Sequence, residues 1–337
     1  MQYVGLDISK KTCYATVMTK DGKITKQEKF LNSIEELDKF LEMLATNASI
    51  VMEASQWEYL YDHIENKGFN VKLADPAKTK AIADAKIKTD KLDSEMLANL
   101  LRANLIAESY IPPKHIRELR NLVRHRAYLV RQRVGLKNQV HALLTKEGID
   151  TPFTDLFGSN GMQFLKQLEL KESHQFALNN YLELINHYNL LIDKTSKRIE
   201  SIGKDIPDIQ LLTTIPGIGS YSAMLLIAEI GDINRFPSAK KLCSYAGLVP
   251  STHQSGGVEY HGHITKRGST WMRWVLIQAT HIAVRQDNYL QRFYYRIAKR
   301  KGGKIAIVAT ARKMLAVVYH MLKTKKEFNA QGSGTLY

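Results

Sequence analysis

Four carboxylates stand at positions from which they could act together on one substrate. Asp7 lies in the first alternating segment of the chain, and Glu53 ends the short apolar run 49–53. Asp90 and Asp93, three residues apart at the start of a helical pattern, project from one helix face. Carboxylate oxygens are the ligands that Mg²⁺ prefers, and two such ions about 4 Å apart promote phosphodiester cleavage. The set therefore predicts a Mg²⁺ site for phosphodiester chemistry.

Each of these acids also has a purely structural interpretation. Asp90 and Asp93 would complement the dipole at a helix N-terminus, as acids do in many helices. Asp7 could form a turn at the end of a strand. We favour the metal site because Asp7 and Glu53 both stand where apolar strands are expected to end.

A serine in a polar, glycine-flanked segment is the second candidate. Ser255 belongs to the run Y-A-G-L-V-P-S-T-H-Q-S-G-G (245–257), which we expect to be a loop. A serine hydroxyl beside glycines can approach a phosphorus atom closely, and neighbouring cations stabilise the charge that develops. Ser-Gly-Gly is also a common flexible turn, and this alternative stays open. No cysteine pair accompanies the nearby histidines, so we expect no zinc at His253, His261 and His263.

Two further features favour contact with nucleic acid. The string I-P-G-I-G (215–219) is typical of the tight turn in a helix–hairpin–helix, where Gly217 and Gly219 let backbone amides approach a phosphate. The same string also occurs as a plain turn. The expected phosphate contacts are basic side chains: Lys266, Arg267 and Arg273 after the serine segment, and Arg124 and Arg131 in the basic helical segment 110–150.

The composition of the chain agrees with a nucleic-acid partner. Its 337 residues carry 48 Lys and Arg against 33 Asp and Glu, a formal net charge of +15. Hydrophobic residues make up 44%, which excludes global disorder and collagen-like repeats. Because only two cysteines are present, a disulfide framework is excluded and a reducing, cytoplasmic environment is expected.

We expect neither a signal peptide nor a membrane partner. The first residues, MQYVGLDISKK, alternate in polarity instead of forming an apolar run. The most apolar stretch near the end, 305–318, is interrupted by Arg312 and Lys313 and is too short to span a bilayer.

Residues 1–110 have the pattern of an α/β domain. A hairpin turn is expected at Asp21-Gly22, and Asn32 or Ser33 should cap the first helix. The expected elements are strands at 3–8, 12–19, 24–30, 49–53 and 69–73, and helices at 34–44, 56–67 and 91–107. Three antiparallel strands, then strand–helix–strand and a helix, is the order of the RNase H-like nuclease fold.

Residues 111–206 have a different pattern and are expected to connect two domains. Apolar residues repeat every seven positions in two segments, at Leu122, Leu129, Leu136 and Leu143 and at Leu178, Ile185, Ile192 and Ile199. The repeats predict two helices packed as an antiparallel coiled coil, with ordinary helix packing inside one domain as the alternative.

Residues 207–330 are expected to form a mostly helical domain that holds the hairpin motif and the serine segment. From His261 to Lys313 this domain carries twelve Lys and Arg and one acidic residue. Residues 331–337 are expected to form a flexible tail.

Two strings are specific enough to indicate a family. They are K-T-D-x-x-D at 88–93 and G-L-x-P-x-x-x-x-S-G at 247–256. They are accompanied by shorter strings in a fixed order, G-L-D (5–7), M-E-A-S (52–55), I-P-G-I-G (215–219) and T-K-R-G (265–268). Over nearly its whole length the chain therefore resembles the DEDD-type insertion-sequence transposases, a family that includes pilin-inversion and bridge-RNA-guided recombinases.

The resemblance implies an RNase H-like (RuvC-like) N-terminal domain, a coiled-coil connector and a C-terminal transposase domain. By motif position, Asp7, Glu53, Asp90 and Asp93 match the family's DEDD set, which binds Mg²⁺, and Ser255 matches its catalytic serine. The implied chemistry is attack of the serine on a DNA phosphate, a phosphoserine intermediate and strand exchange, with the acids completing a composite site. Double-stranded DNA, a guide RNA and further copies of the chain, as a dimer or tetramer, are the implied partners.

Two other functions stay open at this point. A metal-dependent nuclease that resolves DNA junctions would use the four acids and water, without the serine. A non-catalytic nucleic-acid-binding protein has no use for clustered negative charge facing phosphate, so the acids argue against it. Protein covalently joined to DNA would separate the transposase from the nuclease.

Overall fold

The computed structural model describes residues 1–54, 57–82, 89–255, 258–286 and 288–329. Its contacts divide the chain into two units, Met1–Ile111 and Pro112–Tyr337. The division lies one residue from the predicted end of the first domain. The predicted tail at 331–337 lies outside the described residues.

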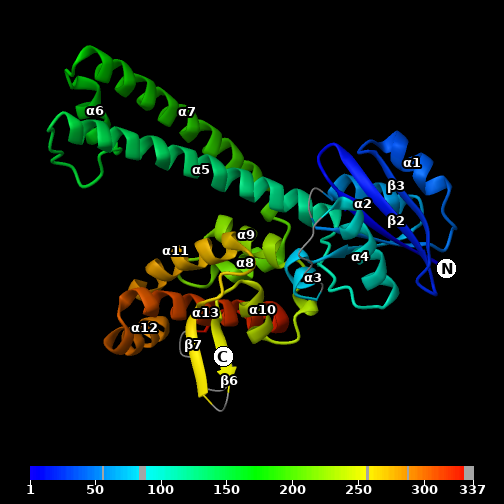
Figure 1. Cartoon of the computed structure of the whole chain (residues 1–337). Helices are drawn as coiled ribbons and strands as arrows, with labels where there is room; N and C mark the ends of the chain where they lie inside the picture. Colours follow the sequence, from blue (N-terminus) through cyan, green and yellow to red (C-terminus); the bar gives the residue numbers. More distant parts are fainter. Residues whose placement is uncertain (55–56, 83–88, 256–257, 287, 330–337) are drawn as a thin grey trace. The chain divides into compact units, whose positions relative to one another are not determined.

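The N-terminal unit is built on a five-stranded mixed sheet (Figure 1). Its strands are β1 (Gln2–Ile8), β2 (Thr12–Thr19), β3 (Ile24–Leu31), β4 (Ser49–Glu53) and β5 (Asn70–Ala74). The spatial order is β3-β2-β1-β4-β5, with β1–β2 and β2–β3 antiparallel and β1–β4 and β4–β5 parallel. The predicted succession of strands and helices is confirmed, and so is the turn at Gly22, whose φ is +84°.

Apolar residues alternate along β1 because one of its faces belongs to a large apolar core, whereas the other carries Gly5 and Asp7. Val4, Leu6 and Ile8 belong to a core with α1 (Ile34–Glu42) and α2 (Glu58–Asn66). The opposite face of the sheet packs against α4, through a smaller cluster. The sheet is therefore an interior layer, and the ends of its strands remain as places for polar side chains.

The helices of this unit differ from the predicted ones at their ends. Ser33 caps α1, as expected, by accepting a hydrogen bond from the Glu36 amide. Helix α4 (Asp90–Arg102) stops five residues before the predicted end, and Asn104 beyond it has a left-handed φ of +54°. The short helix α3 (Pro76–Ile82) was not predicted.

Two long helices of the C-terminal unit lie side by side and form what we call the α5–α7 hairpin (Figure 1). Its elements are α5 (Lys114–Lys146), α6 (Ser159–Gln167) and α7 (Glu172–Gly203). All four predicted heptad positions of α7 are buried, whereas on α5 Leu129 and Leu143 are buried and Leu122 and Leu136 are half-buried. The antiparallel packing of the two predicted helices is confirmed.

The remaining helices gather around a single core. They are α8 (Pro207–Thr213), α9 (Ser220–Ile230), the 3₁₀ turn η1 (Ile233–Arg235), α10 (Ala239–Tyr245), α11 (Thr270–Gln286), α12 (Asn288–Lys301) and α13 (Gly303–Thr324). Leu119, Val123 and Ile199 bring the base of the α5–α7 hairpin into the same core. The hairpin and the C-terminal helices therefore form one unit.

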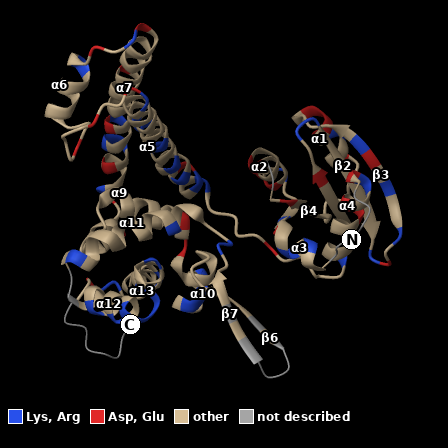
Figure 2. Ribbon diagram, turned by 60° about the vertical axis from the view of Figure 1, so that its left-hand side comes forward, with Lys and Arg blue, Asp and Glu red and all other residues tan. Residues whose placement is uncertain are grey.

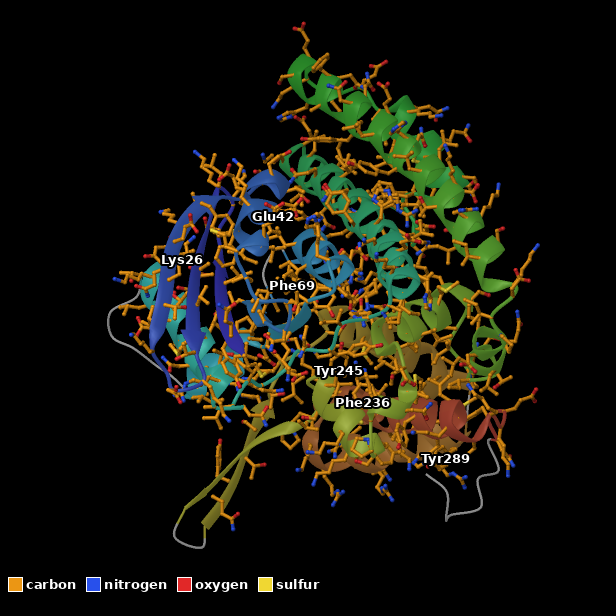
Figure 3. All side chains as sticks on the ribbon, turned by 90° about the vertical axis from the view of Figure 1, so that its right-hand side faces the viewer. Lys26, Glu42, Phe69, Phe236, Tyr245 and Tyr289 are labelled. Carbon is orange, nitrogen blue, oxygen red and sulfur yellow. The ribbon has the colours of Figure 1, made fainter. Side chains whose placement is uncertain are left out.

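The prediction of a loop at 245–257 is wrong in part, because residues 250–255 form the first strand of a β-hairpin. Strands β6 (Pro250–Ser255) and β7 (Val258–Ile264) pair antiparallel and project from the helices (Figures 1 and 3). At the base of this β-hairpin the rings of Phe236 and Tyr245, labelled in Figure 3, lie 5.3 Å apart. Serine, histidine and glutamine supply few of the apolar positions by which a strand is recognised, which explains the error.

Among the described residues, one helix is long and apolar enough to cross a membrane by length and composition alone, and this helix is α13. Most of it is buried within the C-terminal unit, where Met314, Leu315 and Val318 belong to the core. The apolar character of α13 is accounted for by this packing.

Candidate functional sites

Asp7 and Glu53 stand next to each other on neighbouring strands. Strands β1 and β4 run parallel, and their register pairs Leu6 with Met52, so the residue that follows each is a carboxylate. Residues at the same level of adjacent parallel strands point to the same side of a sheet. Both side chains are half-buried at this carboxyl-terminal edge of the sheet.

Helix α4 crosses β1 on the side that carries Asp7. Gly5 precedes Asp7 by two residues and therefore faces the same side. A Cβ atom at Gly5 would lie 2.1 Å from the carbonyl oxygen of Ser94 and 2.6 Å from the amide nitrogen of Ala98. Only glycine allows the helix backbone to approach the strand this closely.

The direction of α4 brings its first turn toward the Asp7 end of β1. Asp90, which begins α4, pairs with Lys29 at the level of Tyr14 and Asp7, whereas Ser94, one turn later in α4, meets Gly5. The helix thus runs against the strand. Asp90 and Asp93 occupy its first turn and share the sheet-facing side with the buried residues four positions later.

Asp90 lies at the outer edge of this arrangement. Its carboxylate is 3.8 Å from the ammonium of Lys29 on β3, and both side chains are about half exposed. Tyr14 lies on β2, between β1 and β3, and is paired in register with Asp7 on β1 and with Lys29 on β3. An ion pair this exposed contributes little to stability, so Lys29 is readily displaced from Asp90.

The donor set fits a hard divalent cation in chemistry, because carboxylates are its preferred ligands. In the described ranges, however, no group of three or more His, Cys, Asp or Glu side chains lies close enough to hold a metal ion. Asp7 and Glu53 form the pair that the fold brings together. Lys88 and Ser55, which belong to the sequence motifs beside these acids, lie outside the described residues.

The negative charge of Asp7 affects the pKa of a buried neighbour, Cys13. Burial, and to a smaller extent the negative charge of Asp7, raise the pKa of the Cys13 thiol to about 12. Cys13 is paired with Ile8 on β1. The thiol therefore stays protonated and acts as an apolar residue of the core rather than as a nucleophile.

Ser255 is the last residue of β6, where its backbone pairs with Val258. Its side chain and the following Gly256 lie outside the described residues. On the same strand the Ser251 hydroxyl donates to the carbonyl of His263, 3.1 Å away, which ties the two strands together. The candidate nucleophile thus stands at the far end of a two-stranded ribbon.

The turn that follows β7 is packed against the end of α10. Gly247 and Gly268 both have a left-handed φ, +67° and +107°. A Cβ atom at Gly268 would lie 1.8 Å from the carbonyl oxygen of Tyr245, and one at Gly247 would lie 2.4 Å from that of Arg267. These contacts hold the segment with Lys266 and Arg267 in place, and both of these basic residues are exposed.

Arg273, on α11, forms hydrogen bonds that stabilise the same turn. Its guanidinium donates to the carbonyls of Ala246, at 2.9 Å, and Gly268, at 3.3 Å. Burial lowers the pKa of this side chain. Arg273 was predicted as a phosphate contact, and in the structure its guanidinium binds these two backbone carbonyls.

The helix–hairpin–helix motif joins α8 to α9, as its sequence predicts. Its two glycines have different surroundings. Gly217 has a φ of +87°, and a Cβ atom there would lie 2.3 Å from the carbonyl oxygen of Ala279. Gly219, the N-cap of α9, faces open space and is exposed, so the first amides of α9 are accessible to an anion.

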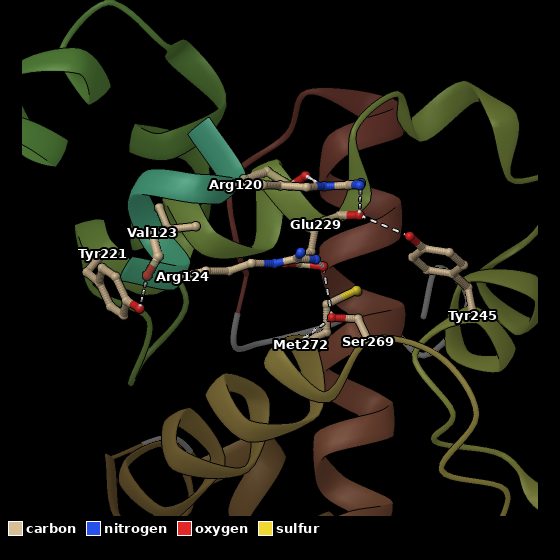
Figure 4. A network of polar contacts seen from close by, with 9 residues as sticks. Arg120, Val123, Arg124, Tyr221, Glu229, Tyr245, Ser269 and Met272 are labelled. Carbon is tan, nitrogen blue, oxygen red and sulfur yellow. Dashed lines mark hydrogen bonds and ion pairs between the residues drawn. The ribbon is translucent and has the colours of Figure 1, made fainter. Parts of the chain in front are cut away.

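A buried carboxylate ties α5, α9 and α11 together (Figure 4). The Glu229 side chain is 1% exposed and accepts from Arg124 at 2.7 and 3.0 Å and from the Ser269 hydroxyl at 2.9 Å. Arg120 adds hydrogen bonds to the carbonyls of Ala228 and Glu229, at 2.6 and 2.8 Å. Ser269 also accepts from the amide of Met272, so the network ends at the first turn of α11.

Arg124 and Arg131 were both predicted as phosphate contacts, and they differ in their surroundings. Lys and Arg residues are distributed along the length of α5 (Figure 2). The Arg124 guanidinium is bound to Glu229, whereas Arg131 is exposed and lies over the ring of Trp271, 5.3 Å from its centroid. Arg131 is thus the more accessible of the two.

Sequence reasoning missed Glu229 and the packing role of Gly5, Gly247 and Gly268. Glu229 is the only charged residue in the apolar run 224–230, and a lone acid in such a run was an available signal for a buried ion pair. The glycines give no comparable signal, because their partners lie far away in the sequence.

Comparisons with known proteins bear on both units. A family model described as "Transposase IS116/IS110/IS902 family" matches residues 209–296, and a DEDD-type model of the IS110 group, described as "Transposase", matches residues 4–148. A transposase for insertion sequence element IS1328 from Yersinia enterocolitica is 26% identical, over 90% of this chain and 89% of that protein.

Two further relatives cover almost the whole chain. A transposase for insertion sequence element IS1111A from Coxiella burnetii is 23% identical, over 97% of this chain and 91% of that protein. A pilin gene-inverting protein from Moraxella lacunata is 26% identical, over 97% of each chain. The chain therefore belongs to the IS110/IS116 family of transposases, DNA transposases and recombinases with a DEDD domain.

Proposed function

We propose that the protein cuts and rejoins DNA of an insertion sequence through a serine-linked covalent intermediate. In this proposal the N-terminal unit has an RNase H-like fold, and the Ser255 hydroxyl oxygen attacks a DNA phosphorus atom. The phosphorus–oxygen bond to the leaving strand breaks, and that strand departs with a free hydroxyl. A strand hydroxyl then attacks the phosphoserine, which restores Ser255 and rejoins DNA without ATP.

The observation that carries the proposal is the register of β1 and β4. It places Asp7 and Glu53 side by side at one edge of the sheet, in a chain of a transposase family. We propose that these two acids, with Asp93 and Asp90, hold Mg²⁺, which would supply stabilisation of charge on the phosphate oxygens. For Asp90, this requires that Lys29 give way to the cation.

The basic residues of the C-terminal unit are proposed to bind the DNA backbone. The exposed Lys266 and Arg267 and the accessible amides after Gly219 are suited to phosphate. A guide RNA and a homo-oligomer, as in the resemblance described above, remain part of the proposal. The net charge of +15 is compatible with both nucleic acids.

The experiment that tests the serine uses a DNA substrate interrupted so that the covalent intermediate accumulates. Ser255→Ala should abolish the protein–DNA adduct seen after denaturing electrophoresis while duplex binding stays within about twofold. Ser251→Ala is the matched control, because this serine lies on the same strand and bonds to the carbonyl of His263. A full yield of adduct from Ser255→Ala would remove Ser255 from the mechanism.

The acids are tested by Glu53→Gln, with Glu42→Gln as control. Glu42 is exposed at the end of α1, on the same unit, and is labelled in Figure 3. We expect Glu53→Gln to abolish metal-dependent strand cleavage and Glu42→Gln to leave it unchanged. Cleavage without any adduct in the unmodified protein would instead favour the junction-resolving nuclease, which uses the same acids with water.

A further inference from the structure

A groove of about 1400 Å³ opens on the C-terminal unit between β7, α10, α12 and α13. It is larger than the roughly 300–1,000 Å³ of most small-molecule pockets. Tyr260 and Ile264, at alternate positions of β7, line one wall. Ile305, Val308 and Arg312, at helical spacing on α13, line the opposite wall. The two walls of the groove are therefore formed by regular elements of the fold.

The floor of the groove is apolar. Cys243 and Leu248, 2% and 1% exposed, lie at its base. Phe293 and Ile297 on α12 are half-buried beside them, and Tyr260 is 66% exposed at the margin. Burial raises the pKa of the Cys243 thiol, so this residue contributes an apolar surface.

The rim of the groove is strongly basic. Among the described residues that line it, seven are Lys or Arg and none is Asp or Glu. Lys266 comes from the turn after β7, and Arg300 and Lys304 come from the two sides of the α12–α13 junction; all three are exposed. An occupant must therefore be negatively charged along its length and apolar where it meets the floor.

A second, shallower hollow continues this surface over α12. Arg300 lines both hollows, and the second also contains Tyr295, which is 55% exposed, between Arg292 and Arg296. Basic residues interleaved with exposed aromatic rings are the pattern by which proteins hold single strands, because bases stack on the rings while cations follow the phosphates. Base-paired DNA presents phosphates but keeps its base faces stacked inside the duplex.

We propose that the groove binds an unpaired stretch of DNA, with bases against its apolar and aromatic lining and phosphates along its rim. DNA is chosen as the source because the inference rests on the proposed function, in which strands must leave one duplex before they join another. The β-hairpin whose outer end carries Ser255 forms one wall of the groove through β7. A strand held there would be kept apart from its former complement.

The stacking surface is tested with the full-length protein and three labelled probes, twelve nucleotides of oligo(dT), a hairpin duplex of equal charge and twelve nucleotides of oligo(rU). Fluorescence anisotropy gives the Kd of each. Tyr260→Leu should weaken oligo(dT) binding about fivefold or more, since stacking contributes about 1–3 kcal/mol per base. Duplex binding should change less than twofold. Tyr128→Leu, at an aromatic residue 50% exposed on α5, is the matched control.

The rim is tested by Arg300→Gln combined with Lys304→Gln. We expect the salt dependence of oligo(dT) binding to fall by about 1.4 in the slope of log K against log salt, since each phosphate contact contributes about 0.7. Lys194→Gln with Lys197→Gln, exposed on α7, is the control pair. Thermal unfolding of every variant should match the parent, which keeps a folding defect apart from a binding defect.

Three outcomes would overturn the inference. The first is that Tyr260→Leu binds oligo(dT) as tightly as Tyr128→Leu does. The second is that Tyr260→Leu loses as much affinity for the duplex as for oligo(dT). The third is that the protein binds oligo(rU) more tightly than oligo(dT) and that Tyr260→Leu removes this preference. If any of these occurs while Ser255→Ala still abolishes the adduct, the proposed function stands and the groove assignment alone fails. If Ser255→Ala keeps the adduct while Tyr260→Leu loses oligo(dT), the serine mechanism fails and the single-strand groove stands.

Discussion

The ion pair between Arg124 and Glu229 provides the sharpest test of how the C-terminal unit is held together. The proposed perturbation is Arg124→Met, which keeps much of the apolar stem and removes the guanidinium. Glu229, 1% exposed, would then keep the Ser269 hydroxyl as its remaining side-chain donor. Removing one partner of a buried ion pair leaves an uncompensated charge, and this costs about 3–5 kcal/mol.

The magnitude belongs at the lower end of that range. The Arg124 side chain is 40% exposed, so water can enter where the guanidinium was. We therefore expect a loss of about 3 kcal/mol in the free energy of unfolding. For a unit the size of Pro112–Tyr337 this corresponds to a fall in Tm of about 6–12 °C.

The assay is a double-mutant cycle in which the thermal unfolding of each variant is measured by calorimetry. Glu229→Gln removes the charge and keeps the shape, so it should cost less than Arg124→Met. The double variant should be more stable than Arg124→Met alone, because no charge is then left without a partner. Arg131→Met is the control, since Arg131 is exposed and lies over the face of the Trp271 ring.

The cycle also decides between two roles for Arg124. If Arg124 acts through Glu229, duplex affinity of the folded variant should stay within about twofold. An unchanged Tm together with a clear loss of DNA affinity would refute the structural reasoning and assign Arg124 to phosphate binding. A double variant less stable than Arg124→Met would equally contradict the buried-charge argument.

Three further predictions follow from close contacts and burial. Gly217→Ala should destabilise the C-terminal unit by at least about 1–2 kcal/mol in chemical unfolding, because the φ of Gly217 is +87° and a Cβ atom there would meet Ala279. Gly219→Ala is the control and should leave the stability unchanged, because a Cβ atom there meets nothing within 4 Å. Equal stabilities of the two variants would contradict the contact. Gly5→Ala should push α4 away from β1, with a loss of about 1–3 kcal/mol and of strand cleavage; a variant with parental Tm and activity would show that the contact is unimportant. The pKa of the Cys13 thiol is raised from 9.0 to about 12, so the protonated thiol contributes fully to stability below pH 9 and this contribution is lost as the pH rises toward 12. The fall in Tm at alkaline pH should therefore be smaller in Cys13→Ala than in the parent. An identical fall would count against the burial of this thiol.

The N-terminal sheet could be predicted closely because its local signals agree with its tertiary structure. The bounds of β2 and β4 match the expected ones residue for residue, since β2 is followed by the Asp21-Gly22 turn and β4 is a short apolar run. Helix α3 escaped prediction because it is short and is started by the Asp75 side chain, which accepts from the amides of Ala77 and Lys78. Local capping of this kind is difficult to distinguish from a loop in the sequence.

The candidate sites could be predicted only in part. Motif positions selected Asp7 and Glu53, and the strand order explains why they become neighbours. The partners of Arg124 and Arg273 could not be anticipated, because Glu229 and Ala246 reach them only through tertiary packing. The groove was missed for the same reason, since its walls come from four elements whose separate patterns describe only their own faces.

The α5–α7 hairpin has two apolar ends joined by a more polar middle. Leu119 and Ile199 belong to the core of the unit, whereas Val140 and Leu178 belong to a separate distal cluster. Between them Arg126 donates to the Ser196 hydroxyl at 2.7 Å. Amide protons beyond this contact should therefore exchange with solvent through openings that leave the globular base folded. We therefore expect the tip of the arm to open at a lower free energy than the base that carries the β-hairpin.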